Sequence, residues 1–217
     1  MIQALFNFAV DQGHLSTNPI ARLRHRKPDP SKGEVLSDQV IRYLTPEQLR
    51  QLYQVVAPDI RLSALVHLLH RTGARIAELL ALNFDDVDLS HRRFQAIGKG
   101  NKQRWCFYSE DAELALERYF RHYRHPGCPA LFTAQHPLTQ VVSRLSYRTV
   151  YTYWRQFTQR DPLLQGVRIH DLRHTFATER VGLMGIEELR ALMGHENIQT
   201  TLRYQKVTSE RAEVAAQ

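Results

Sequence analysis

The apolar residues of this chain follow two different periods, and the change from one to the other limits the possible folds. Over most of the sequence they recur three or four residues apart, as in amphipathic helices. Between residues 87 and 108 they alternate instead, in short runs around Val87, Phe94 and Trp105, and Gly98-Lys99-Gly100-Asn101 separates the last two runs. We therefore expect a mainly α domain with a small antiparallel β-sheet, an α+β fold, with Lys99 in or beside the hairpin turn.

The helical segments also carry recognisable start signals. Thr45-Pro46-Glu47-Gln48 combines a cap residue, a proline at the first helical position and early acidic character, which predicts a helix from there to about Val56. A second helix is expected over residues 60–71 and a third after Gly73. Further helices are expected over residues 109–123, 146–160, 170–181, 186–193 and 198–205.

Three regions follow from these patterns. Residues 1–20 contain one short helix that cannot bury its apolar face alone, and residues 43–217 form the main domain. The segment between them, residues 21–42, is an extended basic linker containing Arg22, Arg24, Arg26 and Lys27. It is expected to act as a solvated tether or as a basic strap across DNA phosphates.

The charge of the chain favours a polyanionic partner. A net charge of +7 suits nucleic acid, but by itself it also suits an anionic membrane surface. No apolar run approaches the length that spans a bilayer, and the start lacks a secretory signal. The two cysteines have no metal or redox spacing, so we expect a cytoplasmic protein with reduced thiols.

Basic and hydroxyl side chains occur in an order that suggests phosphodiester chemistry. An attacked phosphodiester gains negative charge on its nonbridging oxygens, which planar guanidinium groups stabilise well. A tyrosine hydroxyl is a weak nucleophile at neutral pH, so nearby cations must lower the cost of forming phenolate. The candidate catalytic residues are Arg75, Lys99, His170, Arg173, His195 and Tyr204.

The motifs around these residues resemble the catalytic domain of the tyrosine recombinases, or phage integrases, particularly the Xer-like bacterial type. The resemblance runs from about Tyr43 to Val207 and rests on Thr-Gly-Ala-Arg-Ile-Ala-Glu-Leu, Gly-Lys-Gly-Asn-Lys, His-Asp-Leu-Arg-His-Thr-Phe-Ala-Thr, Leu-Met-Gly-His and Thr-Thr-Leu-Arg-Tyr, all in family order. By this resemblance, residues 1–20 are the remnant of the last helix of an N-terminal core-binding domain, and residues 43–217 have the family's catalytic-domain fold.

The resemblance implies a site-specific recombinase that cuts and rejoins DNA through a covalent 3′-phosphotyrosyl link to Tyr204. Arg75 and Arg173 clamp the phosphate, His170 and His195 bond to it, and His170 is a possible proton acceptor from the tyrosine. A hairpin lysine protonates the leaving 5′ oxygen, with Lys99 preferred and Lys102 as the alternative.

The resemblance further implies that the partner is double-stranded DNA. The protein forms a homotetramer on DNA and a monomer or weak oligomer without it, and needs no cofactor, metal or membrane. DNA contacts are expected from Lys102 and Arg104 as well as from the linker residues.

Two metal sites are conceivable and disfavoured. His170 and His174 have the spacing of a zinc site, but Arg173 lies between them and its charge opposes a dication. His174 is instead expected to pack against neighbouring helices and buttress the site. Asp85, Asp86 and Asp88 suggest a metal-dependent nuclease, yet they fall in a short loop without a further carboxylate group. Two other functions remain open: a noncatalytic DNA-binding regulator of recombination sites and a DNA-relaxing enzyme like the type IB topoisomerases.

Overall fold

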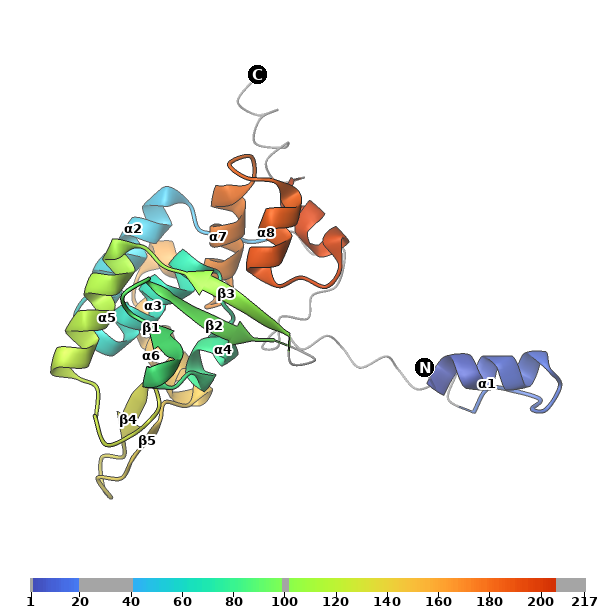
Figure 1. The fold of residues 1–217 in the computed structure, drawn as a ribbon, viewed down its shortest axis with the longest axis horizontal. Helices are drawn as coiled ribbons and strands as arrows, with labels where there is room; N and C mark the ends of the chain where they lie inside the picture. Colours follow the sequence, from blue (N-terminus) through green and yellow to red (C-terminus); the bar gives the residue numbers. More distant parts are fainter. Residues whose placement is uncertain (1, 20–40, 99–101, 206–217) are drawn as a thin grey trace. The chain divides into compact units, whose positions relative to one another are not determined.

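The computed structural model describes residues 2–19, 41–98 and 102–205. The chain divides into two compact units, residues 1–39 and residues 40–217. In the first unit, helix α1 (Ile2–Asp11) is present where the sequence predicted a short helix. The second unit carries the remaining helices and all the strands in the described part of the chain (Figure 1).

Helix α3 (Ile60–Thr72) lies at the centre of the second unit. It contacts α2 (Pro46–Val56), α4 (Ile76–Ala81), α5 (Glu110–His122), α6 (Tyr147–Thr158) and α7 (Asp171–Arg180). Because it is surrounded, its apolar residues are not confined to one face, and nine of its thirteen residues are buried. Other large side chains that complete this core are Leu52, Leu79, Phe94, Leu116, Phe132 and Leu172.

The predicted start of α2 is confirmed in detail. The Thr45 hydroxyl accepts a hydrogen bond from the Gln48 amide, and the Gln48 side chain accepts one from the Thr45 amide. This reciprocal pair is a capping box, and Pro46 occupies the first helical position.

Helix α3 ends at Gly73 in a way that brings the next helix to the site. Gly73 has a φ of 62°, and a Cβ at this position would collide with the ring of Phe176 on α7. A residue without a side chain therefore lets the turn approach α7 closely. Arg75 follows two residues later, immediately before α4.

The antiparallel sheet is confirmed where the apolar period is two. Its order is β1 (Val87–Asp88), β2 (Arg93–Ile97), β3 (Gln103–Phe107), and Phe94 on β2 pairs with Cys106 on β3. Phe94, Ala96 and Cys106 face the core, whereas Ile97, Trp105 and Phe107 are exposed. Strand β3 contacts helix α8 (Ile186–Met193), which joins the sheet to the C-terminal helices.

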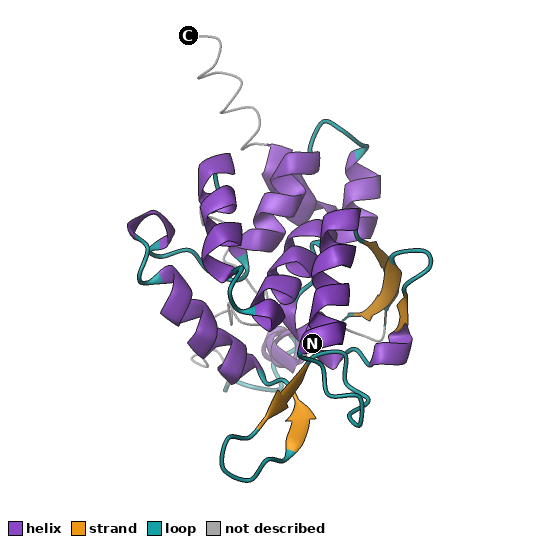
Figure 2. Ribbon diagram, turned by 90° about the vertical axis from the view of Figure 1, so that its left-hand side faces the viewer, coloured by secondary structure: helices purple, strands orange, loops and turns teal. Residues whose placement is uncertain are grey.

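A second sheet was not predicted. Strands β4 (Thr133–Gln135) and β5 (Val142–Arg144) form a hairpin that projects from the helical body of this unit (Figure 2). Each strand has three residues, too few for an alternating pattern to stand out in the sequence. Short 3₁₀ turns at Phe84–Asp86 and Pro162–Leu164 were also not predicted.

The C-terminal part follows the expected order of helices. Helices α7 and α8 lie beside each other, and residues 198–205 are helical (Figure 1). The predicted mainly α fold with a small antiparallel sheet is confirmed. Among the helices of the described ranges, none combines the length and the apolar character needed to cross a membrane.

Candidate active site

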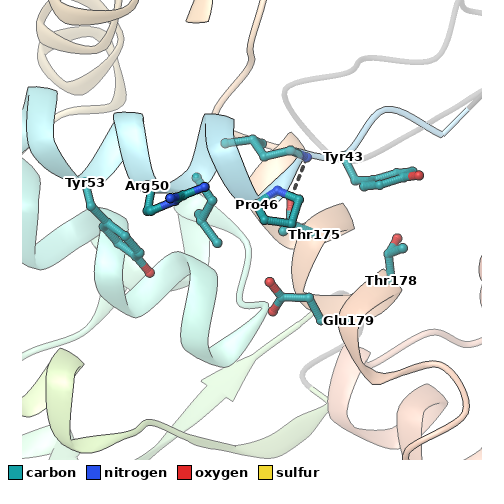
Figure 3. A pocket seen from close by; sticks show the side chains of 9 residues that line it. Tyr43, Pro46, Arg50, Tyr53, Thr175, Thr178 and Glu179 are labelled. Atoms are coloured by element: carbon teal, nitrogen blue, oxygen red, sulfur yellow. Dashed lines mark hydrogen bonds between the residues drawn. The ribbon is translucent and has the colours of Figure 1, made fainter. Parts of the chain in front are cut away.

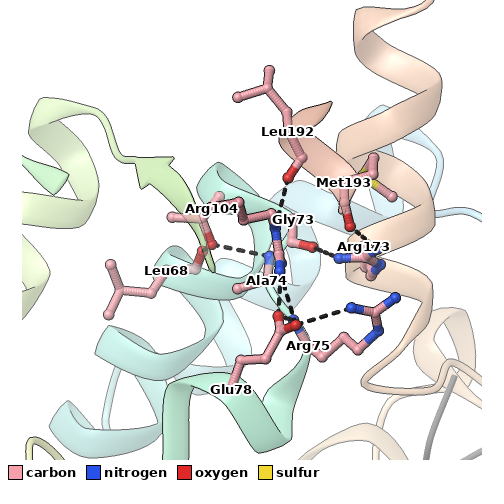
Figure 4. Close-up of polar contacts among 10 residues, drawn as sticks. Leu68, Gly73, Ala74, Arg75, Glu78, Arg104, Arg173, Leu192 and Met193 are labelled. Carbon is pink, nitrogen blue, oxygen red and sulfur yellow. Dashed lines mark hydrogen bonds and ion pairs between the residues drawn. The ribbon is translucent and has the colours of Figure 1, made fainter. Parts of the chain in front are cut away.

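The candidate site gathers residues from five separate parts of the second unit. Arg75 precedes α4, Arg104 lies on β3, Arg173 lies on α7, His195 follows α8 and Tyr204 lies in the last described helical segment. The guanidinium groups of Arg75, Arg104 and Arg173 lie together with one carboxylate, that of Glu78 (Figure 4). Three cations around one carboxylate leave an excess of positive charge, which suits an anion such as a phosphodiester.

Arg173 is held rigidly by main-chain carbonyls. Its side chain is buried, Nη1 donates to the Gly73 carbonyl and Nη2 donates to the Met193 carbonyl. Burial and the neighbouring charge of Arg75 lower the pKa of Arg173, but a guanidinium remains charged at neutral pH. The two carbonyls come from the α3–α4 turn and the end of α8, so Arg173 connects the segments that carry Arg75 and His195.

Arg75 is oriented by Glu78, one turn further along. Its Nη1 donates to Glu78 Oε1 at 2.9 Å, and its backbone amide donates to Oε2 at 2.7 Å. The Arg75 side chain is 28% exposed, more than that of Glu78 at 5%. The guanidinium is therefore anchored on one side and accessible on the other, as a phosphate contact requires.

Tyr204 lies within the same cluster, in the same chain. Its side chain is 3% exposed, and its hydroxyl lies 2.8 Å from Nδ1 of His174. Its ring is parallel to that of His195, with the centroids 6.3 Å apart. Burial raises the pKa of Tyr204, whereas the charges of Arg173, Arg203 and Arg75 act to lower it. These cations thus offset part of the cost that burial adds to forming the phenolate, which an attack on phosphorus needs.

Three histidines around Tyr204 are uncharged at neutral pH. Burial, followed by nearby cations, lowers the pKa of both His170 and His195 to about 3. The His174 pKa falls to about 2 through burial and the neighbouring His170. The His170 and His174 rings meet edge to face at 4.7 Å, and His195 Nδ1 lies 2.9 Å from the Thr201 hydroxyl. Each neutral ring can therefore donate one hydrogen bond and accept another without carrying a charge.

These depressed pKa values predict a loss of stability in mild acid. An unfolded histidine takes up a proton near pH 6.5, whereas these three resist protonation when folded. Because the unfolded chain then binds more protons, stability is complete above pH 6.5 and falls towards pH 3. We expect a loss of about 1 kcal/mol per histidine for each pH unit below 6.5.

Thermal unfolding at pH 7.5, 6.5 and 5.5 measures this effect, because few carboxylates titrate in that window. The midpoint is expected to fall between pH 6.5 and 5.5 by more than between pH 7.5 and 6.5. A midpoint that stays level down to pH 5.5 would contradict the buried neutral histidines.

Several of the expected site residues lie outside the described residues. These are Lys99 and the linker residues Arg22, Arg24, Arg26 and Lys27. Lys102, the alternative to Lys99, is described: its ammonium lies 3.1 Å from Glu196, beside His195, and its side chain is 70% exposed. An exposed pair of this kind contributes little to stability and leaves the lysine accessible.

Arg104, one of the expected DNA contacts, makes its bonds within the protein. Its side chain is 9% exposed and bonds to both oxygens of Glu78 and to the carbonyl of Leu192. Its partner carboxylate lies 26 residues earlier in the sequence.

Sequence reasoning missed two functional contacts. Glu78 was not among the candidate residues, yet it is buried between Arg75 and Arg104. His174 was expected to pack against helices and support the site; it is buried, and its contact with the Tyr204 hydroxyl was not foreseen. Its position four residues after His170, on the same helix face, was the available signal.

Two other features stand apart from the candidate site. A pocket between α2 and α7 is lined by Tyr43, Tyr53, Thr175 and Glu179 among others, and none of the predicted catalytic residues lines it (Figure 3). In the acidic loop, Asp88 bonds with Ser90, His91 and Arg93. Within the described ranges, no group of three histidine, cysteine or acidic residues is arranged to hold a metal ion.

Comparison with known proteins agrees with the motifs. Residues 42–211 match the sequence profile described as the Phage integrase family. The chain belongs to the phage integrase family. The family match thus covers every described residue of the candidate site.

Individual relatives of this integrase-family chain are bacterial recombinases. It is 29% identical over 213 residues to a tyrosine recombinase XerC of Vibrio parahaemolyticus, covering 94% of this chain and 64% of that protein. XerC of Staphylococcus epidermidis is 27% identical over 218 residues, covering 97% and 69%. The chain therefore spans about two thirds of the length of these relatives.

Solved structures share the fold. The crystal structure of XerA recombinase superposes with a TM-score of 0.62 at 25% identity, covering 94% of this chain and 76% of that one. XerH bound to a palindromic difH substrate, in a post-cleavage complex, gives a TM-score of 0.70 at 22% identity, covering 98% and 63%. The expected tyrosine recombinase catalytic-domain fold is confirmed.

Proposed function

We propose that this chain is the catalytic part of a site-specific DNA recombinase that cuts and rejoins strands through a 3′-phosphotyrosyl intermediate. The observation that carries the proposal is the position of the Tyr204 hydroxyl. It lies in the same chain as the guanidinium groups of Arg75 and Arg173, whose charges act to lower its pKa against the effect of burial. Binding alone would not require a nucleophile placed among phosphate-binding cations.

We propose a role for each group. Arg75 and Arg173 stabilise the charge that develops on the nonbridging oxygens. His195 has Nδ1 engaged by Thr201, so its Nε2 donates to the phosphate, and His170 supplies a second donor. As the Tyr204 oxygen attacks, its proton passes to His170, the acceptor that the resemblance implied, or to His174, whose Nδ1 lies 2.8 Å from the hydroxyl. Lys99, or Lys102 as the alternative, protonates the departing 5′ oxygen.

The partner in this proposal is double-stranded DNA. The site carries excess positive charge, and the related XerH and λ integrase structures contain DNA. Each strand exchange keeps the phosphodiester energy in the tyrosyl link, so neither a nucleotide cofactor nor a metal is required. Four strands are cut in a complete exchange. We therefore propose a homotetramer on DNA, with a monomer or weak oligomer in its absence, in the bacterial cytoplasm.

A suicide substrate tests the activity. Double-stranded DNA with a nick just downstream of the cleavage point releases a short 5′-hydroxyl strand after attack, which traps the covalent product. In EDTA, the protein is expected to form a DNA adduct that survives denaturing electrophoresis. A retarded native complex without an adduct would instead indicate a noncatalytic regulator. Relaxation of supercoiled DNA without exchange between two sites would indicate a topoisomerase.

A further inference from the structure

The guanidinium of Arg104 donates hydrogen bonds to other groups of the protein. Nη1 donates to Glu78 Oε1 at 2.9 Å, Nη2 donates to Glu78 Oε2 at 2.7 Å, and Nε donates to the Leu192 carbonyl at 2.9 Å (Figure 4). The pairing with Glu78 is bidentate, a geometry that a planar guanidinium provides and an ammonium does not. A lysine at this position could not make all three contacts together.

Glu78 is shared between Arg104 and Arg75. Each oxygen of its carboxylate accepts from both residues, from Arg75 through Nη1 and the backbone amide. Burial acts to raise the pKa of Glu78, but the hydrogen bond and charge of Arg104 outweigh it and lower the pKa to about 2. Glu78 is therefore an anion at neutral pH. Because Arg104 compensates this anion, the charge of Arg75 remains available for a phosphate.

The Nε and Cδ atoms of Arg104 lie against the turn that carries His195. Leu192, whose carbonyl it binds, lies in the last turn of α8, and Gly194 caps that helix with a φ of 61°. A Cβ on Gly194 would lie 2.9 Å from Arg104 Cδ and 3.0 Å from Nη1. The Arg104 side chain thus packs closely against the glycine immediately before His195.

We propose that Arg104 is a positioning residue that joins Arg75 and the His195 turn into one phosphate-binding unit, through Glu78 on one side and through Leu192 and Gly194 on the other. The inference rests on the proposed recombinase function. It assigns to Arg104 a role in the geometry and charge of the phosphate clamp, in place of direct contact with DNA.

Arg104→Lys tests the inference because it keeps the positive charge and removes the planar guanidinium that binds Glu78 through two nitrogens. In single-turnover assays on the nicked substrate in EDTA, adduct formation is expected to slow by about 10²-fold, the size of effect that a small misplacement of reacting groups produces. DNA affinity, measured by fluorescence anisotropy, is expected to stay within about twofold, because phosphate contacts elsewhere supply most of it. A matching loss of affinity would overturn the proposal in favour of direct DNA contact.

A second substrate separates positioning from general damage to the fold. A methylphosphonate at the cleavage position removes one nonbridging charge, so less charge remains for the clamp to stabilise. The ratio of wild-type to Arg104→Lys rates is expected to shrink to about threefold on this substrate. An equal ratio on both substrates would overturn the proposal. Glu78→Gln weakens the pairing of Glu78 with Arg104 while Arg104 stays in place. It should show the same difference between the two substrates. If the Arg104→Lys protein is unfolded, Glu78→Gln replaces it in the test.

Arg93→Lys is the matched control. Arg93 lies on the neighbouring strand β2, bonds to Asp88 at 3.0 Å and packs over the Trp105 ring. The rates of adduct formation by the Arg93→Lys protein are expected to stay within about twofold of wild type on both substrates, since exposed ion pairs contribute little. If wild-type protein forms no adduct, the recombinase function itself fails. If wild type reacts and Arg104→Lys reacts equally fast, only the role of Arg104 fails.

Discussion

Tyr204→Phe is expected to abolish covalent joining to DNA. Phenylalanine keeps the ring beside His195 and removes the oxygen that attacks phosphorus. His174 loses its 2.8 Å partner, so the free energy of unfolding should fall by about 1 kcal/mol. That cost leaves the fold intact, and DNA binding should remain near the wild-type level.

Denaturing electrophoresis after incubation with the nicked substrate measures this loss directly. Tyr151→Phe is a suitable control because Tyr151 is exposed on α6 and stacks on Tyr147, away from the described site residues. It should form adducts at the wild-type rate. Equal adduct yields from Tyr204→Phe and wild type would remove Tyr204 as the nucleophile.

Arg173→Lys is expected to have the second largest effect, slowing adduct formation by about 10³-fold. The lysine ammonium cannot bind both the Gly73 and Met193 carbonyls in the geometry of the guanidinium, nor present the same donors to phosphate. A buried carbonyl that loses its partner costs about 1–3 kcal/mol, so thermal stability should fall as well.

Separate measurements distinguish these two consequences of Arg173→Lys. The rate of adduct formation is measured well below the unfolding midpoint of the variant, where nearly all of the protein is folded. Arg168→Lys serves as a control on a more exposed arginine, which pairs with Asp171 at 2.7 Å near the same helix start. A folded Arg173→Lys protein that cleaves within about tenfold of wild type would show that the phosphate clamp does not depend on this guanidinium.

Local sequence signals predicted most of the fold because they act over a few residues. The Thr45-Pro46 cap, the glycine after Thr72 and the two-residue period from residue 87 each specify a local conformation that the structure shows. The β4–β5 hairpin was missed because strands of three residues leave almost no period to detect. Its geometry depends on packing that a local pattern does not contain.

Local patterns likewise predicted part of the candidate site and missed contacts between residues that are distant in the sequence. The motifs indicated Arg75, His170, Arg173, His195 and Tyr204, and the structure brings all five into one cluster. The burial of Arg104 could not be predicted, because its partner carboxylate lies 26 residues away. The spacing of His174 from His170 indicated the right helix face, but its partner Tyr204 lies 30 residues away and was not identified. Exposed and buried arginines look alike in a sequence, and only the distant carboxylate distinguishes them.

Mapping the residue joined to DNA tests the central claim most directly. The adduct formed on nicked DNA in EDTA is digested with a protease and a nuclease, and the remaining nucleotide-bearing peptide is sequenced by mass spectrometry. We predict a phosphate on the Tyr204 oxygen, linked to the 3′ end of the cut strand. A nucleotide attached to any other residue, or a link to the 5′ end, would contradict the account.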